Sequence, residues 1–462
     1  MSDSTSRAQA RRKPMAACMA SVFALAAPLS CVAISVTDCG DTGPNTLRGI
    51  IATAGNNATI DTSACSTITL TSGAIPVGQN SLTINGPTNG THTKITAIGS
   101  SVKDRIFTHS GNLNFSLNRL DIEYGRAYDG SLSNPGPGVN GGCIASTGNV
   151  FLTDSNVAHC SANSLHGRVY GGGIFAGKVV WITRSTVTNN LATSLSAATY
   201  GGGVFSAGEF IAKYSTVSGN VACPNAGCSG TGGGVASHGG ASIGNSTISG
   251  NAARGDIGGV SLTSFSASPP TATISNSTIS GNRAVTGSVG GIYSTVPITV
   301  SNSTIAFNAA VSGSRASGLS IRAQYASITA TLNSVLISNN AYGASPTERD
   351  FSASNAAAYT LAVSGANNLI ATSSGPAPTN GLITACALLG PLRDNGGSTK
   401  THQLLSGSPA FDVGNDTSSA SPPHYDQRGT GFPRSLGINP DIGAVEVDQN
   451  EVVFNNGFDG CP

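Results

Sequence analysis

Carboxylates are scarce in the middle of the chain, where only Asp154, Glu209 and Asp256 occur between residues 151 and 345. A glycosidase of the ordinary type needs two carboxylates facing one bond, and a polysaccharide lyase needs a calcium-binding acidic cluster with a basic residue. The three carboxylates fall at different points of the repeat described below. We therefore expect no catalytic residues, because these groups would not converge on one face.

Several side chains share one register of that repeat and should stack on successive turns. Asp154, Arg184 and Tyr214 are one such set, which we interpret as a structural ladder of charge and aromatic groups. A second set consists of rings that flank glycine triplets: Tyr170, Tyr200, Phe175 and Phe205. Rings in an exposed row can bind sugars or partner proteins, and internal stacking is the alternative.

The C-terminal part is richer in charge than the middle of the chain. Its charged residues include Asp412, Asp416, Asp426, Asp441, Glu446, Arg428 and Arg434. Calcium binding is one interpretation, and salt bridges that hold a cap on an open end of the fold are the other. The histidines lack metal-ligand spacing, and no Gly-x-Ser-x-Gly or phosphate-binding loop occurs. We therefore expect no cofactor, and calcium at the C-terminal carboxylates is the alternative.

Eight cysteines follow the predicted export signal described below, at positions 39, 65, 143, 160, 223, 228, 386 and 461. An even number suits an oxidising compartment, and the absence of CxxC argues against a zinc ribbon. We predict pairs Cys39–Cys65 and Cys223–Cys228. Sequence does not fix the partners of Cys143, Cys160, Cys386 and Cys461.

Composition limits the class of protein. The chain has 462 residues, 60 of them glycine, with 23 basic and 22 acidic residues and 39% hydrophobic residues. This hydrophobic content with a net charge of +1 excludes a disordered chain, and the lack of a Gly-X-Y period excludes collagen. Near neutrality also removes the electrostatic case for nucleic acid or an anionic membrane as a partner.

The chain repeats itself between about residues 140 and 345. One series reads like Ser277-Thr278-Ile279-Ser280-Gly281-Asn282, and a second, interleaved series reads like Gly201-Gly202-Gly203-Val204. Short β-branched runs bounded by Gly or Asn predict strands. Ile274 and Ile279 have opposite parity, so a left-handed bend at Asn276 would turn both inward. Such turns, stacked at about 4.8 Å, predict an all-β parallel β-helix of roughly ten coils with terminal caps.

Asparagines recur three residues after the repeating aliphatic residue. We predict a structural ladder of stacked amides in which each member bonds to the next. Its members are Asn190, Asn220, Asn251, Asn282, Asn308 and Asn339. A second, partial ladder is predicted for Asn245, Asn276, Asn302 and Asn333.

Residues 1–33 have the pattern of an export signal. Four basic residues precede an apolar run from 16 to 27, which is too short to span a bilayer, and Cys31-Val32-Ala33 ends the segment. Two alternatives stay open: twin-arginine export through Arg11-Arg12, and lipoprotein cleavage before Cys31. We expect an exported protein with no transmembrane span, either secreted or on the outer cell surface.

The pattern resembles the right-handed parallel β-helix proteins of the pectin-lyase-like class, especially bacterial surface proteins with Gly-Gly-x-[Ile/Val] repeats. Residues 38–51 look like their opening segment, although Thr46 and Gly49 depart from it. Residues 389–402, 408–412, 426–429 and 441–446 look like the choice-of-anchor Q domain. The segments expected are a signal peptide (1–33), an N-terminal cap with the first coils (34–95), β-helix repeats (96–385), a choice-of-anchor Q-like module (386–447) and a short tail (448–462).

The resemblance implies an exported bacterial protein and no agreed enzymatic activity. We expect a non-catalytic, adhesin-like monomer that contacts an extracellular glycan or a cell-surface partner. The alternative is a polysaccharide lyase or glycoside hydrolase that acts on extracellular polysaccharide, which rests on analogy of fold.

Overall fold

The computed structural model describes residues 33–448 except 100, 102, 134, 135, 137, 312–314, 343–346 and 416–424. Residues 1–32 of the predicted export signal and residues 449–462 of the predicted tail lie outside the described residues. Asp416 and Cys461 do so as well.

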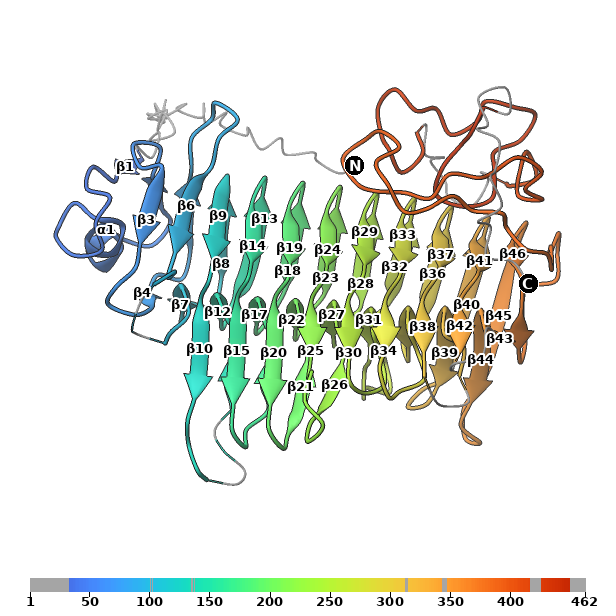
Figure 1. Cartoon of the computed structure of the whole chain (residues 1–462), viewed down its shortest axis with the longest axis horizontal. Helices are drawn as coiled ribbons and strands as arrows, with labels where there is room; N and C mark the ends of the chain where they lie inside the picture. Colours follow the sequence, from blue (N-terminus) through green and yellow to red (C-terminus); the bar gives the residue numbers. More distant parts are fainter. Residues whose placement is uncertain are drawn as a thin grey trace, which may run out of the picture. The chain divides into compact units, whose positions relative to one another are not determined.

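Short parallel strands stack turn upon turn, as Figure 1 shows. The prediction of an all-β parallel solenoid is confirmed, with about nine turns instead of roughly ten. Within the described residues the strands form five sheets, which we name A to E. A turn runs through sheets C, A, B and D in that order, and four central turns add a strand to sheet E.

Sheet A contains β1 (Ile34–Ser35), β2 (Ala58–Asp61), β5 (Leu82–Asn85), β8 (Asn114–Asn118), β13 (Asn149–Thr153), β18 (Val180–Thr183), β23 (Phe210–Lys213), β28 (Ala241–Gly244), β32 (Ala272–Ser275), β36 (Ile298–Ser301), β40 (Ile328–Asn333) and β45 (Leu361–Ala366). Sheet B contains β3 (Thr67–Thr69), β6 (Thr93–Thr96), β9 (Leu120–Glu123), β14 (Asn156–Ala158), β19 (Thr186–Thr188), β24 (Thr216–Ser218), β29 (Thr247–Ser249), β33 (Thr278–Ser280), β37 (Thr304–Ala306), β41 (Leu336–Ser338) and β46 (Leu369–Ile370).

Sheet C contains β4 (Ile75–Val77), β7 (Phe107–His109), β12 (Ile144–Ser146), β17 (Ile174–Ala176), β22 (Val204–Ser206), β27 (Val235–Ser237), β31 (Val260–Leu262), β35 (Ile292–Ser294), β39 (Leu319–Ala323), β44 (Phe351–Asn355) and β47 (Ser373–Ser374). Sheet D contains β10 (Arg126–Asp129), β15 (Ser161–Ser164), β20 (Leu191–Ser194), β25 (Val221–Ala222), β30 (Ala252–Ala253), β34 (Arg283–Ala284), β38 (Ala309–Ala310), β42 (Ala341–Tyr342) and β43 (Thr347–Glu348). Sheet E contains β11 (Val139–Asn140), β16 (Val169–Tyr170), β21 (Ala198–Tyr200) and β26 (Ser229–Thr231).

The helix α1 (Leu47–Thr53) lies at the N-terminal end of the stack and contacts β4. Thr46 caps it by accepting a hydrogen bond from the Gly49 amide, and Leu47, Ile50 and Ile51 are buried. A Cβ atom at Gly49 would lie 2.1 Å from the Gly43 carbonyl oxygen, so glycine is required there.

Bends between sheets A and B turn the aliphatic residues of both strands into one core. The residue at this bend adopts a left-handed conformation in successive turns, including Asn276 with φ of 44° and Arg184 with φ of 45°. Ile274 before the bend and Ile279 after it are both fully buried. The predicted inward bend at Asn276 is confirmed.

The asparagine ladder forms as predicted along five of its six positions. Each side-chain amide donates to the Oδ1 atom of the next member at 2.9 Å, from Asn190 through Asn220, Asn251 and Asn282 to Asn308. Each Oδ1 of Asn220, Asn251, Asn282 and Asn308 also accepts the backbone N–H of the preceding member. Every donor and acceptor of these buried amides is therefore used.

The prediction that Asn339 is the last member of the ladder is wrong, because Asn340 occupies that position. Asn308 donates to the Oδ1 atom of Asn340 at 2.9 Å, and Asn340 donates to Asp350 at 2.8 Å. Sheet B pairs Ile305 with Ile337, one residue later than the predicted Leu336. Asn339 instead has a φ of 61° and occupies the left-handed corner before the ladder.

The predicted second asparagine ladder is wrong. Asn245 and Asn276 adopt the left-handed bend, and their amides donate to carbonyl oxygens of residues 425–427 instead of to each other. Asn333 lies inside β40, and Ser334 takes the bend. A ladder of buried serines occupies this corner, because backbone amides donate to the hydroxyls of Ser185, Ser215, Ser246, Ser277 and Ser303 on the next turn.

Residues 386–448, which we call the C-terminal module, pack along sheet B. Figure 1 shows their loops beside the ends of β29 to β46. Leu389, Leu404 and Ile442 of the module share a hydrophobic cluster with Ala306 and Leu336 of the solenoid. The prediction that this part caps the open coil end is wrong, because its partners are side chains along the flank of several turns.

Polar contacts fasten the module to the same flank. Thr247 donates to the Lys400 carbonyl oxygen at 2.6 Å, and Thr278 donates to the Gln427 side chain at 2.6 Å. The Ser280 hydroxyl lies 2.7 Å from Nε2 of His402, whose Nδ1 lies 2.6 Å from the Gly390 carbonyl oxygen. Hydroxyl groups on sheet B therefore form hydrogen bonds with the C-terminal module.

The two predicted disulfides, Cys39–Cys65 and Cys223–Cys228, are confirmed. Cys143 and Cys160, which sequence left without partners, form a third. The Cys160 amide also donates to Oδ1 of Asn190, so this disulfide adjoins the first member of the ladder.

Candidate functional site

The aromatic residues singled out in the sequence stack in pairs, as predicted. Tyr170 and Tyr200 lie on sheet E with ring centroids 5.1 Å apart and planes 10° apart. Phe175 and Phe205 lie on sheet C with centroids 5.7 Å apart and planes 4° apart. Tyr170 also meets Phe205 edge to face at 4.8 Å, so the four rings form one cluster.

Further rings extend this cluster along the solenoid. His238 lies 5.1 Å from Phe205, Phe265 lies 6.1 Å from His238, and Tyr325 lies 5.0 Å from Phe265. These residues follow β27, β31 and β39 in loops, where the repeat pattern does not constrain them. Sequence reasoning missed them because they share no register with Phe175 and Phe205.

A groove with a volume of about 480 Å³, which we call the aromatic groove, is lined by the rings of Tyr170, Tyr200, His238, Phe265, Tyr293 and Tyr325. Along sheet C, the row that begins at Phe205 continues through Ala236 and Ser261 to Tyr293. The small side chains of Ala236 and Ser261 leave a depression between the two rings, which lie three turns, or about 14 Å, apart. Phe265 lines the groove, and 70% of its surface is exposed, so its ring does not contribute to the hydrophobic core.

Polar groups fix the side chains at the far end of the groove. The Tyr293 hydroxyl donates to Oε1 of Gln324 at 3.2 Å, and Nε2 of Gln324 donates to the Tyr325 hydroxyl at 3.0 Å. The guanidinium of Arg315 lies over the Tyr293 ring, 4.8 Å from its centroid. Burial raises the pKa of Tyr293, so its hydroxyl stays a neutral donor.

The groove is more basic than acidic. Arg168 and Arg315 line it, and Asp256 is the sole carboxylate among its described lining residues. Burial lowers the pKa of His238, which favours the neutral imidazole. The arrangement therefore offers apolar ring faces, hydrogen-bonding groups and positive charge.

Asp154, Arg184 and Tyr214, which the sequence predicts to stack on successive turns, all occupy the left-handed corner between sheets A and B. Asp154 and Arg184 form a two-bond ion pair at 2.6 and 2.8 Å, and this hydrogen bonding lowers the pKa of Asp154. Tyr214 takes the same left-handed corner one turn later. Both charged side chains are substantially exposed, so the pair contributes little to stability.

The C-terminal carboxylates separate into two groups. Asp412, Asp441 and Glu446 bring ligand atoms within 4.8 Å of one another, whereas Asp426 pairs with Arg428 at 2.6 Å. Burial raises the pKa of Asp441 to about 6 and that of Glu446 to about 7. Glu446 accepts the backbone amides of Leu436 and Asp441, at 2.9 and 2.8 Å, so it already fastens the module.

Those three carboxylates offer the donor set that calcium prefers, and calcium binding there stays a prediction. The buried Arg434 guanidinium acts on both Asp441 and Glu446 and lowers their pKa values against the effect of burial. A cation would have to share the site with this fixed positive charge.

No family model, curated protein or solved structure matches the chain. Among the described residues, no helix has the length and apolar character needed to cross a membrane.

Proposed function

We propose that this chain is an exported, non-catalytic β-helix protein that holds an extracellular glycan in the aromatic groove. The observation that carries the proposal is the continuous row of rings from Tyr170 to Tyr325, with Phe265 exposed. Flat ring faces pack against the apolar C–H faces of sugars, while neighbouring amides and hydroxyls bond their hydroxyl groups.

The spacing of the turns also suits a polymer. Parallel strands repeat at about 4.8 Å, so equivalent groups recur at a constant interval along the solenoid. Repeated ring contacts along one chain would add up to useful affinity even where each contact is weak.

Export and attachment are supported by the sequence. The pattern of residues 1–33, the disulfides and the resemblance to pectin-lyase-like, choice-of-anchor Q surface proteins favour a right-handed β-helix outside the cytoplasm. An adhesin-like monomer, secreted or held at the outer cell surface, fits these features.

The enzyme alternative, a polysaccharide lyase or glycoside hydrolase, has less support at the groove. An ordinary glycosidase needs two carboxylates across one bond, and Asp256 is the only described carboxylate that lines the groove. Asp154 is engaged with Arg184 at a corner between sheets A and B, away from these rings.

Binding of the mature protein to a broad polysaccharide panel tests the proposal. We expect Phe265→Ala to weaken binding about tenfold, since loss of a stacked ring costs on the order of 1 to 2 kcal/mol. Tyr214→Ala is the matched control, because it removes an exposed ring outside the groove. Equal binding by both variants would contradict the proposal, and release of reducing ends or unsaturated products would favour the enzyme alternative.

A further inference from the structure

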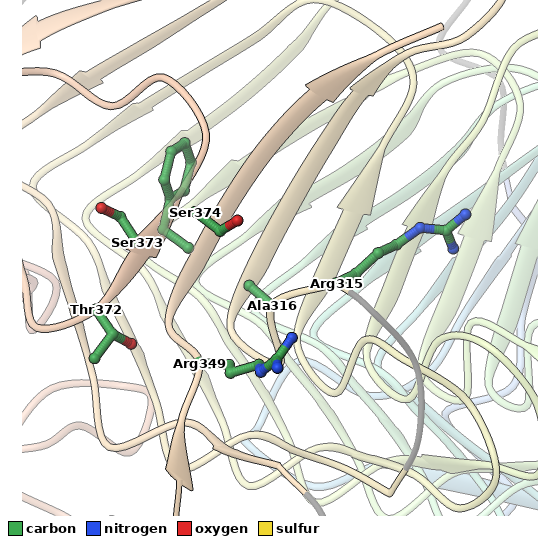
Figure 2. A pocket seen from close by; sticks show the side chains of 7 residues that line it. Arg315, Ala316, Arg349, Thr372, Ser373 and Ser374 are labelled. Atoms are coloured by element: carbon green, nitrogen blue, oxygen red, sulfur yellow. The ribbon is translucent and has the colours of Figure 1, made fainter.

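An apolar cleft lies between the solenoid and the C-terminal module, at the corner that follows sheet B. Its volume is about 950 Å³. Leu389, Pro391 and Leu392 of the module line it, and Phe307 lines it from the solenoid. The pocket shown in Figure 2 differs, because arginine, serine and threonine side chains make up most of its lining. The cleft therefore suits an apolar occupant.

Glycines leave the cleft open at this corner. Gly250, Gly281 and Phe307 occupy the left-handed position after sheet B in successive turns, with φ of 62°, 65° and 56°. A Cβ atom at Gly250 would meet no heavy atom within 4 Å, and the nearest atom to one at Gly281 would lie at 3.8 Å. The Phe307 ring packs against His402 with centroids 4.9 Å apart. This corner thus accommodates one aromatic ring, and its two preceding positions carry no side chain.

A disulfide at Cys386 brings a second segment of the chain to this corner. Cys386 is disulfide-bonded, and the six other cysteines among the described residues form three pairs with one another. Cys461 is the remaining cysteine after the predicted export signal. Sγ of Cys386 lies 3.9 Å from Oδ1 of Asn339, which occupies the same corner one turn beyond Phe307. The partner of Cys386 must therefore lie beside the end of the cleft.

We infer that the cleft holds the chain's own tail, with Cys461 bonded to Cys386 and the Phe458 ring over Gly281. Both tail residues lie outside the described residues. Phe458 precedes Cys461 by three positions, which span up to about 10 Å. The turn of Asn339 and the turn of Gly281 are two strand intervals apart, also about 10 Å. A ring at position 458 therefore reaches the open corner when residue 461 is bonded to Cys386.

The composition of residues 449–460 matches the cleft. Three further residues of this segment are apolar or acidic near its start, in Glu451-Val452-Val453, and Phe454 follows them. The segment has two acidic residues and no basic residue, and Asp459 adjoins Phe458. Arg393 is exposed and lines the cleft, so a carboxylate beside the seated ring would meet a positive charge.

The start of this segment is also held near the cleft. Val447 belongs to the same hydrophobic cluster as Leu389, which lines the cleft. Residues 449–460 therefore run from one edge of the C-terminal module to Cys386 at the other. Burial of the Phe458 ring removes apolar surface of both the tail and the cleft from water.

The Cys386–Cys461 bond forms by exchange with an oxidised dithiol carrier of the export compartment. One thiolate attacks the disulfide of the carrier and gives a mixed disulfide, and the second thiolate then displaces the carrier as a dithiol. The two cysteines lose two protons and two electrons, and the carrier gains both.

Two measurements on the full mature protein test the inference. Mass spectrometry of a non-reduced digest should find the peptide that contains Cys386 linked to the peptide that contains Cys461. Hydrogen exchange should show the backbone amides of residues 389–393 exchanging about tenfold faster in Phe458→Ser, because the cleft loses its ring. Asn455→Ser is the matched control in the same segment, and exchange in it should equal that of the wild type.

Three results would overturn the inference. A bond from Cys386 to Cys31 or to a second chain, or a free thiol at Cys386, would refute the disulfide. Equal exchange of residues 389–393 in Phe458→Ser and the wild type would refute the position of the ring, even with the disulfide present. Equally faster exchange in Asn455→Ser would show a general effect of the segment and also refute the position of the ring.

Discussion

Replacement of Asn251 by alanine should destabilise the solenoid strongly. The Asn251 side chain is fully buried and makes four hydrogen bonds. Its amide donates to Oδ1 of Asn282 and to the Val217 carbonyl oxygen, and its Oδ1 accepts two bonds from Asn220. At about 1 kcal/mol net for each bond, the loss is about 4 kcal/mol. The Val217 carbonyl oxygen and the side-chain amide of Asn220 each lose a buried partner in this variant.

Asn114→Ala is the control, because Asn114 is exposed and accepts a single side-chain bond from Asn149 at 2.9 Å. We expect it to cost less than about 1 kcal/mol. Urea denaturation compares the midpoints, and hydrogen exchange locates the effect, since a solenoid can open locally. Protection should fall in β29 and β33 and persist in β8. The ladder reasoning fails if Asn251→Ala shifts the midpoint no more than Asn114→Ala.

Further predictions concern the C-terminal module and the third disulfide. Burial lowers the pKa of His402 from 6.5 to about 4, so the stability it contributes is present above pH 6.5 and is lost as pH falls toward 4, by about 3 kcal/mol. Hydrogen exchange should show that protection of the module decreases as pH falls over this range, and that the decrease is smaller in His402→Gln. An equal decrease in the variant would exclude His402 as its cause. Burial raises the pKa of Glu446 from 4.5 to about 7, so the opposite limb, present at low pH and lost as pH rises through 7, should flatten in Glu446→Gln. Replacing both Cys143 and Cys160 with serine should cost about 3 kcal/mol in urea denaturation, and an unchanged midpoint would refute a role for this disulfide in stability.

The repeat made most of the fold predictable, since a residue type that recurs once per turn reports a constant environment. The ladder from Asn190 to Asn308 and the bend at Asn276 followed from this regularity. The prediction slipped by one residue at the last turn, because Val335, Leu336 and Ile337 are all aliphatic and each could continue the core column. Only the pairing of Ile305 with Ile337 resolves that register.

Features outside the repeat were less accessible to sequence reasoning. Tyr170 and Tyr200 were found because glycine triplets mark their register, whereas Phe265 and Tyr325 lie in loops and join the groove only in space. The place of the C-terminal module was also missed. Its contacts with Thr247 and Thr278 depend on hydroxyls that in the sequence look like ordinary strand residues.

The direction of the asparagine ladder limits how such a protein can lengthen. Each side-chain amide donates a hydrogen bond to the next turn, and the series finishes at Asp350, both of whose carboxylate oxygens accept hydrogen bonds. A turn added after this point would receive no donor from it. A duplicated inner turn, by contrast, would bring its own asparagine and restore the series on both sides. Growth by internal duplication is therefore open to this molecule, and growth at this end is closed.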